Sequence, residues 1–176
     1  MIFTPTHIPG VWIVDVEPRE DPRGFFARTW CRDEFARHGL DARLVQCNIS
    51  FNRSRHTLRG MHYQAPPHEE PKLVRCTRGR IWDVALDLRR DSPTYCRWVA
   101  IELSAENRRA LFIPTGCAHG FLTLEDNSEV FYQMGEAYRP EAARGVRWND
   151  PAFGIKWPTE LPFLSEKDAS YPDFAP

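Results

Sequence analysis

The sequence predicts an all-β fold, an antiparallel double-sheet sandwich or barrel with only a few short helices. Short apolar segments recur at regular spacing along the 176 residues, and helical periodicity is rare. The chain contains 15 prolines and 10 glycines without any internal repeat, which indicates many turns between those segments. The length favours a single domain over residues 1–176.

The expected elements follow one another with short connections. Strands are predicted at residues 12–16, 25–30, 44–51, 58–64, 73–76, 80–88, 97–103, 111–114, 119–124 and 128–138. A short helix is predicted at 32–38, because Gly39 is a typical helix stop. Ser104 is expected to cap a single helical turn at 104–107. The tail at 148–176, rich in proline and aromatic residues, is expected to wrap over the barrel.

The segment 44–51 alternates most cleanly between apolar and polar residues. Its apolar face carries Val45, Cys47, Ile49 and Phe51, and its other face carries Leu44, Gln46, Asn48 and Ser50. Alternation with a period of two predicts a strand with one apolar face. The amides of Gln46 and Asn48 are compatible with solvent or with a ligand cavity, and the alternation alone favours solvent.

Composition narrows the class of protein. The net charge of −1 gives no indication of a nucleic-acid partner or an anionic membrane. No apolar run approaches the length of a membrane span, and residues 1–5 do not resemble a signal peptide. The five cysteines are odd in number and lack metal-type spacing, so free thiols in a reducing cytoplasm are expected.

The segment 58–64 is the first candidate for chemistry. His62 and Gln64 share one face of the predicted strand, and Arg59 points the other way unless a bulge intervenes at Gly60. Lys72 opens the next strand. A second histidine, His119, follows on a later strand, and two histidines and a lysine that converge inside a barrel would form a proton-transfer site.

Basic residues cluster around this segment. Seven of them, against Glu69 and Glu70, lie between positions 53 and 80: Arg53, Arg55, Arg59, Lys72, Arg75, Arg78 and Arg80. Such a local positive field suits a phosphate-bearing ligand, but alternating solvated charges on strand edges would give the same count. Arg59 beside His62 favours the ligand.

Pro114, Gly116 and His119 form a Pro-x-Gly-x-x-His pattern that matches the second sequence motif of cupin barrels. Metal-binding cupins carry His-x-His and a glutamate in their first motif, whereas this chain has Gln64 at the place of the second histidine. A metal site at His62, His119 and Glu69 or Glu70 therefore remains an alternative. A metal-free cupin that uses its histidines for acid–base work is better supported. The third possibility is that both histidines are hydrogen-bonded residues of the barrel core without a chemical role.

Tyr132 and Asp168 attract no functional interpretation from their local sequence. Tyr132 shares a strand face with Val130 and Met134, as a core tyrosine does. Asp168 looks like a surface carboxylate or a charge at the start of a helix.

Many segments in one order nevertheless resemble the dTDP-4-dehydrorhamnose 3,5-epimerase family of nucleotide-sugar cupins. They are residues 21–26, 46–50, 58–64, 72–75, 83–89, 103–107, 113–121, 148–151 and 164–168. Each motif is weak alone, but their common order covers nearly the whole chain. The resemblance implies a cupin-type antiparallel jelly-roll barrel, and an isomerase that epimerises a 4-keto-6-deoxy sugar attached to a nucleoside diphosphate.

The resemblance also implies roles for individual residues. His62 would be the general base, and Asp168 would hold its imidazole and raise its basicity. Lys72 would stabilise the enolate oxygen by charge. Tyr132 would deliver a proton to the opposite face of the sugar. No metal and no cofactor is implied.

The remaining implied contacts concern binding. Arg59 and His119 would contact the sugar and the phosphates, and Tyr138 would pack beside the ligand. Gln46 and Asn48 would hold the nucleotide together with Arg23 and Phe26, which would come from the partner chain of a homodimer. Arg28 stands near the nucleotide, at a position where the family commonly has glutamate.

Further departures from the family pattern are Cys47 in place of an aspartate and His56 in place of a glycine. Because Arg28 reverses a charge near the nucleotide, the sequence leaves open which nucleobase the substrate carries. It also leaves open an epimerase that inverts one carbon, a ketoisomerase acting on another sugar nucleotide, and a non-catalytic sugar-nucleotide-binding cupin. Gln64 disfavours a metal cupin oxygenase.

Overall fold

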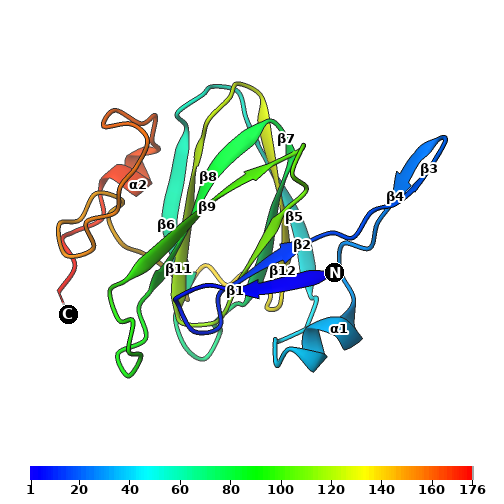
Figure 1. Cartoon of the computed structure of the whole chain (residues 1–176). Coiled ribbons are helices and arrows are strands. Elements are labelled where there is room, and N and C mark those ends of the chain that lie inside the picture. The colour runs from blue at the N-terminus through cyan, green and yellow to red at the C-terminus, as the bar shows by residue number, and fades with distance from the viewer. Residues whose placement is uncertain (176) are drawn as a thin grey trace.

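Two antiparallel sheets face each other and form a barrel in the computed structural model, which describes residues 1–175 (Figure 1). The first sheet has the strand order β1-β2-β10-β7-β12-β5. Its strands are β1 (Ile2–Pro5), β2 (Trp12–Asp15), β10 (Ala110–Ile113), β7 (Lys72–Arg78), β12 (Ser128–Met134) and β5 (Gln46–Asn52).

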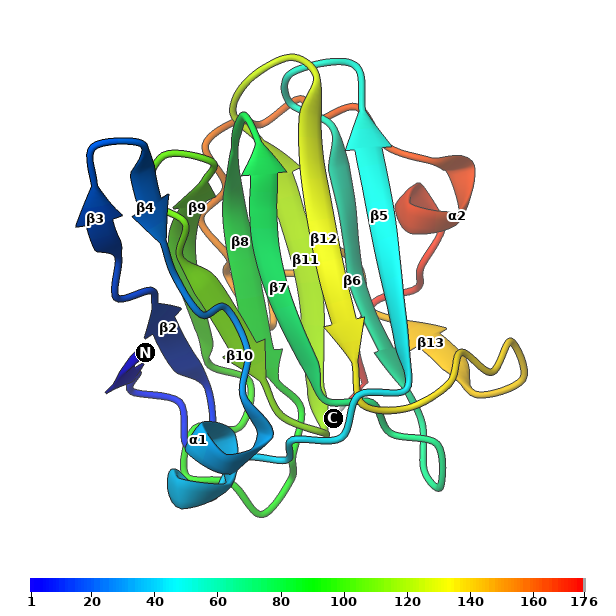
Figure 2. The same cartoon turned by 90° about the vertical axis from the view of Figure 1, so that its right-hand side faces the viewer.

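The second sheet has the order β13-β6-β11-β8-β9 and lies behind the first one in Figure 2. Its strands are β13 (Ala143–Gly145), β6 (Leu58–Gln64), β11 (Cys117–Thr123), β8 (Arg80–Asp87) and β9 (Trp98–Ser104). A separate hairpin of β3 (Arg19–Asp21) and β4 (Gly24–Phe26) projects away from the barrel. The helices are α1 (Arg32–Arg37) and α2 (Glu166–Ala169). The cupin-type antiparallel jelly roll predicted from the sequence is confirmed.

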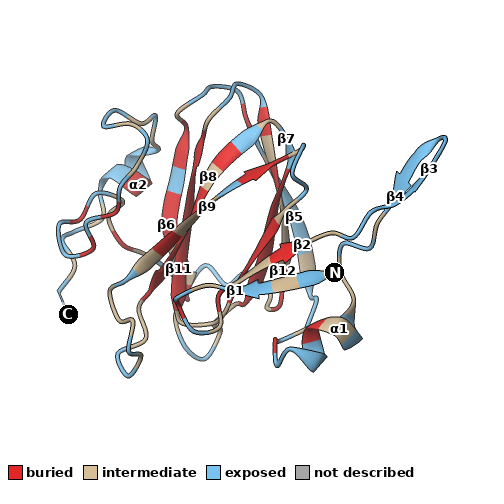
Figure 3. Cartoon of the chain, viewed as in Figure 1, coloured by how far each residue is buried: buried red, intermediate tan, exposed pale blue. Residues whose placement is uncertain are grey.

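The main core lies between the two sheets. Val74 and Val130 reach it from the first sheet, and Ile81 and Phe121 reach it from the second. All seven residues of β11 are buried, because the barrel interior covers one face of the strand and the C-terminal segment covers the other (Figure 3).

The tail covers the outer face of the second sheet, as the sequence analysis expected. Phe153 and Ile155 pack there against Val84 and Leu86 of β8. Position 176, the last of the predicted tail, lies outside the described residues. No helix within residues 1–175 is long and apolar enough to cross a lipid bilayer.

Two of the predicted strands end well before their expected boundaries. The strand expected at 25–30 ends at Phe26, because the hairpin joins neither sheet. The strand expected at 128–138 ends at Met134, where both neighbouring strands begin, at Gln46 and at Lys72.

The single helical turn expected at 104–107 forms, because the Arg108 N–H donates to the Ser104 carbonyl at 3.0 Å, but no longer helix follows. The predicted cap hydrogen bond does form, since the Asn107 backbone N–H donates to Ser104 Oγ at 3.0 Å.

Candidate active site

A cavity of about 450 Å³ opens between the two sheets, a size that suits a small organic ligand. Eight of the twelve residues predicted for the site line it: His62, Asp168, Tyr132, Lys72, Asn48, Arg59, His119 and Tyr138. Seven of them come from the two sheets and from α2, and Tyr138 lies in the loop between β12 and β13.

A bulge at Gly60 brings Arg59 and His62 to the same cavity. The pairing of β6 with β11 shifts by one residue between His119 and Phe121. Gly60 has a φ of +144°, and a Cβ at this position would lie 2.5 Å from the Cα of Gly120. The bulge that the sequence left open at Gly60 is present, and only glycine fits where the two strands approach so closely.

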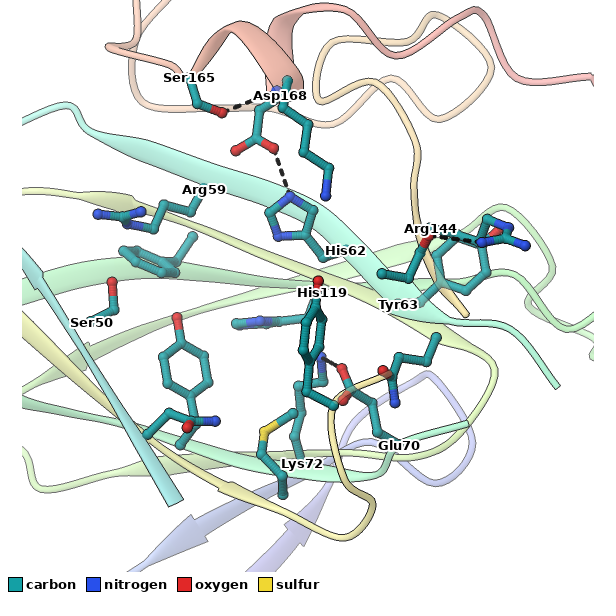
Figure 4. Close-up of a pocket in the computed structure, with 18 of the residues that line it drawn as sticks. Ser50, Arg59, His62, Tyr63, Glu70, Lys72, His119, Arg144, Ser165 and Asp168 are labelled. Atoms are coloured by element: carbon teal, nitrogen blue, oxygen red, sulfur yellow. Dashed lines mark hydrogen bonds and ion pairs between the residues drawn. The ribbon is translucent and has the colours of Figure 1, made fainter. Parts of the chain in front are cut away.

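His62 is paired with Asp168, which reaches β6 from the C-terminal segment. Nε2 of His62 lies 2.7 Å from Oδ1 of Asp168, and the carboxylate is 5% exposed. Burial alone would raise the pKa of Asp168, but hydrogen bonds from His62 and the Gly60 backbone outweigh it and lower the pKa. Asp168 is therefore ionised and accepts, so Nε2 donates and Nδ1 is left for the cavity (Figure 4).

Local backbone structure places Asp168. Leu58 N–H donates to the Phe163 carbonyl at 2.9 Å, and Phe163 N–H donates to the His56 carbonyl at 2.8 Å. These bonds hold the C-terminal segment along the start of β6. Ser165 then caps α2, because its Oγ accepts from the Asp168 N–H at 3.1 Å.

Lys72 forms a buried ion pair with Glu70 at one wall of the cavity. Nζ of Lys72 lies 2.8 Å from Oε1 of Glu70, and the two side chains are 5% and 9% exposed. From the sequence, Glu70 was considered only as a metal ligand and as an acidic residue within the basic cluster, and its contact with Lys72 was not predicted. The pair keeps a fixed positive group where substrate charge can develop.

His119 belongs to a second histidine–aspartate pair. Its Nε2 lies 2.7 Å from Oδ1 of Asp83, and both side chains are buried. Sequence reasoning did not identify Asp83 as the partner of His119. The available signal was its place on the inward face of β8, between Ile81 and Ala85, where a carboxylate needs a partner.

Tyr132 lies on β12, in the sheet opposite to that of His62. Its ring makes an edge contact with His119, with centroids 5.9 Å apart. Burial raises the pKa of the Tyr132 phenol, and the charge of Asp83 adds to that effect. Tyr132 therefore remains protonated at neutral pH and can donate a proton.

The amide face of β5 points into the barrel, because Asn48 is the register partner of Tyr132, which packs against the core. Asn48 lines the open cavity and is also exposed to solvent, so it meets both of the surroundings that the sequence left open. Gln46 does not line the cavity but supports it, because its Oε1 accepts from the Tyr138 N–H at 2.9 Å.

The other three predicted binding residues lie away from the cavity of their own chain. Arg23 pairs with Asp21 on the projecting hairpin, at 2.6 Å. Phe26 is 72% exposed. Arg28 pairs with Glu34, also at 2.6 Å.

The side chain of Gln64 forms hydrogen bonds with two loops. Its Oε1 accepts from the Arg139 N–H at 2.6 Å, and its Nε2 donates to the His68 carbonyl at 2.8 Å. Among residues 1–175, no three histidine, cysteine, aspartate or glutamate side chains gather as a group that could hold a metal ion.

Fold and cavity together define a cupin whose side chains are equipped to move protons. The sequence model of the dTDP-4-dehydrorhamnose 3,5-epimerase family matches residues 5–176. The chain therefore belongs to this family of isomerases and is an enzyme.

Individual relatives agree with that assignment. A dTDP-4-dehydrorhamnose 3,5-epimerase of Salmonella typhimurium is 43% identical over 174 residues, covering 98% of this chain and 94% of that protein. The crystal structure of the enzyme from Elizabethkingia anophelis superposes with a TM-score of 0.94 at 37% identity, covering 99% of this chain and 96% of that one. The Legionella pneumophila enzyme, solved with dTDP-4-keto-L-rhamnose, gives a TM-score of 0.90 at 36% identity, covering 97% and 90%.

Proposed function

We propose that the enzyme converts dTDP-4-dehydro-6-deoxyglucose to dTDP-4-dehydrorhamnose by inverting carbons 3 and 5. One observation carries the proposal: a hydrogen-bonded histidine and a protonated tyrosine line one cavity from opposite sheets. A base and an acid that approach a sugar ring from two sides are what inversion at carbon requires. The relative from Legionella pneumophila, which was solved with a 4-keto sugar nucleotide, supports the substrate class.

Proton removal is the first step. The ketone at carbon 4 acidifies the protons on carbons 3 and 5, and Nδ1 of His62 takes one of them. The electron pair of the broken C–H bond forms an enolate with its charge on the ketone oxygen. Lys72 stabilises that oxygen, since a preorganised buried cation acts most strongly where water is excluded. Asp168 stabilises the imidazolium that forms on His62.

Inversion is completed from the other side of the ring. Tyr132 donates its phenolic proton to the carbanion face opposite to His62, and the ketone re-forms. The raised pKa of Tyr132 supports this role, because the group is protonated before the step. The imidazolium of His62 and the phenolate of Tyr132 return to their starting forms by proton exchange through solvent, and the second carbon follows the same course.

Binding of the nucleotide falls to the polar residues at the cavity. Arg59 is fixed by a hydrogen bond from its Nε to Asn52 Oδ1 at 2.8 Å, which leaves its other nitrogens for the phosphates. His119, Asn48 and Tyr138 add contacts to the sugar and the nucleotide. Neither a metal nor an organic cofactor takes part, and retention of full activity after exhaustive chelation is the test.

We infer that the protein works as a homodimer. Ile49 and Phe51 form an exposed apolar surface on β5, and Phe26 is exposed on the projecting hairpin. A second copy that covers these surfaces would also bring Arg23 and Phe26 to the partner's cavity. A monomer by light scattering at micromolar concentration would contradict this.

A mixing experiment tests the shared site more sharply. Arg23→Ala and His62→Ala chains are each expected to be poorly active alone. Unfolded and refolded together, they form mixed dimers in which one cavity has an intact His62 and an intact partner Arg23. Activity should reappear in the mixture, and its failure to do so would place Arg23 at the cavity of its own chain or outside the site.

One experiment discriminates among the possible reactions. The enzyme is incubated with dTDP-4-dehydro-6-deoxyglucose in deuterated water, and incorporation is followed at each carbon by NMR. Deuterium and inversion at carbons 3 and 5 are expected. Inversion at one carbon would indicate a single-carbon epimerase, migration of the ketone would indicate a ketoisomerase, and no exchange would indicate a binding protein.

The cellular location is part of the same proposal. We expect the enzyme to act in the cytoplasm, where nucleotide sugars and a reducing environment occur together. All five cysteines are free, in agreement with that setting. Fractionation of cells that produce the protein is the direct measurement.

A further inference from the structure

The C-terminal segment beyond α2 fits against β13 through an aromatic side chain. Gly145 is the last residue of β13 and the register partner of His62 on β6. A Cβ added to Gly145 would lie 2.6 Å from the hydroxyl oxygen of Tyr171 and closer still to its ring carbons. Gly145 has no positive φ, so its backbone would accept any residue. The tyrosine ring is therefore what requires glycine at this position.

The Tyr171 ring also contacts His62, the proposed general base. The centroids of His62 and Tyr171 lie 6.3 Å apart, and the ring planes meet at 65° in an edge-to-face arrangement. Burial raises the pKa of the Tyr171 phenol, in agreement with a ring that is partly enclosed. Tyr171 thus touches both members of one register pair, His62 and Gly145.

Asp168 lies between two points at which its segment is fixed. On one side, the backbone bonds of Phe163 hold the segment to the start of β6. On the other side, the Tyr171 ring rests on Gly145. Helix α2 spans only four residues and cannot hold its shape alone, because so short a helix is unstable without packing. Asp168 therefore depends on both fixed points for its 2.7 Å contact with His62.

We propose that Tyr171 and Gly145 form a latch that positions Asp168 against His62. Tyr171 is in this view a positioning residue that acts through Asp168 and does not touch the substrate. The inference deepens the proposed function, on which it rests only for the role of His62 as the base. The latch itself is a packing relationship and can be measured without substrate.

The test is a double-mutant cycle on the two latch residues. In Gly145→Ala, the added methyl group displaces the ring, and kcat should fall about ten- to a hundredfold with little change in KM. In Tyr171→Ala, the segment loses one fixed point, and kcat should fall in the same direction. In the double variant, the methyl group enters the space that the ring has left, so its kcat should be no lower than that of Tyr171→Ala. Tyr171→Phe retains the ring and should retain the activity.

A spectroscopic measurement supplies a second, substrate-free result. The proton that Nε2 of His62 donates to Asp168 should give a low-field NMR signal in the wild-type protein. The signal should weaken or move in Gly145→Ala and in Tyr171→Ala, and persist in Tyr171→Phe. Phe174→Ala is the control, because it removes a contact of the same segment with Phe153, away from Gly145, and should leave the signal unchanged.

The outcomes separate the latch from the proposed reaction. If the His62 signal responds as described but no variant or wild-type protein epimerises the sugar, the latch stands and the proposed function fails. The latch is wrong if Gly145→Ala leaves both kcat and the signal unchanged. It is equally wrong if Gly145→Ala is as harmful in the Tyr171→Ala background as in the wild-type background, since the ring would then play no part.

Discussion

His62 and His119 are register partners on β6 and β11, and each donates from Nε2 to a different aspartate at 2.7 Å. The two pairs differ in burial: the side chain of His62 is 41% exposed, and that of His119 is 5% exposed. An accessible imidazole can meet a proton on the substrate, whereas an enclosed one is better suited to hold a fixed hydrogen bond. We therefore assign chemistry to the first pair and binding to the second.

Aspartate-to-asparagine substitutions should separate the two pairs kinetically. Asp168→Asn should lower kcat, because the imidazolium of His62 loses its charge partner during proton removal. Asp83→Asn should raise KM about ten- to a hundredfold and change kcat little, since it weakens one hydrogen bond to a binding residue. Steady-state kinetics of the two variants checks this. Equal losses of kcat in both would contradict the division of roles.

Variants that remove the base, His62, and the acid, Tyr132, should differ in how much deuterium the sugar takes up from solvent. His62→Ala should abolish both exchange and epimerisation, because no enolate forms. Tyr132→Phe should still form the enolate, so exchange with retention should survive while inversion falls. A positioned acid or base contributes about 10²- to 10⁴-fold, so either loss is measurable by NMR. Exchange at the wild-type rate in His62→Ala would place the base elsewhere.

The buried pair of Lys72 and Glu70 predicts separate effects on rate and stability. Lys72→Met should slow exchange, because the enolate loses its cation. It should also destabilise the fold by about 3–5 kcal/mol, because Glu70 remains buried without a partner. Lys72→Met with Glu70→Gln should recover most of the stability but none of the rate. Denaturant unfolding and exchange kinetics of the single and double variants provide the measurements.

Particular residues show how far the sequence could be interpreted. Alternation predicted the strands that form the barrel, and Gly60 marked the bulge that turns Arg59 toward His62. The alternation of β5 was correct, but which of its faces points inward depends on the neighbouring strand β12, and no local pattern reports that.

Contacts between segments far apart in the sequence were also beyond prediction from local sequence patterns. Asp168 meets His62 across 106 positions of the chain, and only the family resemblance pointed to it. Asp83 is marked only as a carboxylate on an otherwise apolar strand face, and the ring of Tyr171 has no local pattern. Their roles arise from packing between segments that are far apart in the sequence.

Gly60→Ala should be strongly destabilising. The new Cβ would lie 2.5 Å from the Cα of Gly120, and the residue would keep an unfavourable positive φ. Overpacking and backbone strain together should cost about 2–5 kcal/mol. Gly39→Ala is the matched control, because it has a φ of +69° and no atom within 4 Å of the added Cβ. Gly39→Ala should lower the free energy of unfolding by about 1 kcal/mol, which measures the cost of a positive φ without overpacking. An equal loss in both variants would refute overpacking at Gly60.

Asp87 should make stability depend on pH in the acid range. Burial alone would raise the pKa of this carboxyl group, but hydrogen bonds from Arg89, Ser92 and Thr94 outweigh it and lower the pKa to about 2. Because the pKa in the folded state lies below the unfolded value of about 4, the ionised group stabilises the fold above about pH 4. That contribution should disappear as the pH falls through about 4 toward about 2.

The corresponding measurement compares unfolding of the wild type and Asp87→Asn at several pH values. The variant should be less stable by about 2 kcal/mol at about pH 7, and most of the difference should be lost at about pH 2, where roughly half of the wild-type carboxyl groups are neutral. Asp91, which is exposed in the loop that follows β8, is the control, and Asp91→Asn should change stability by less than about 0.5 kcal/mol at either pH. A difference between wild type and Asp87→Asn that stayed constant over this range of pH would mean that Asp87 stabilises the loop by shape and not by charge.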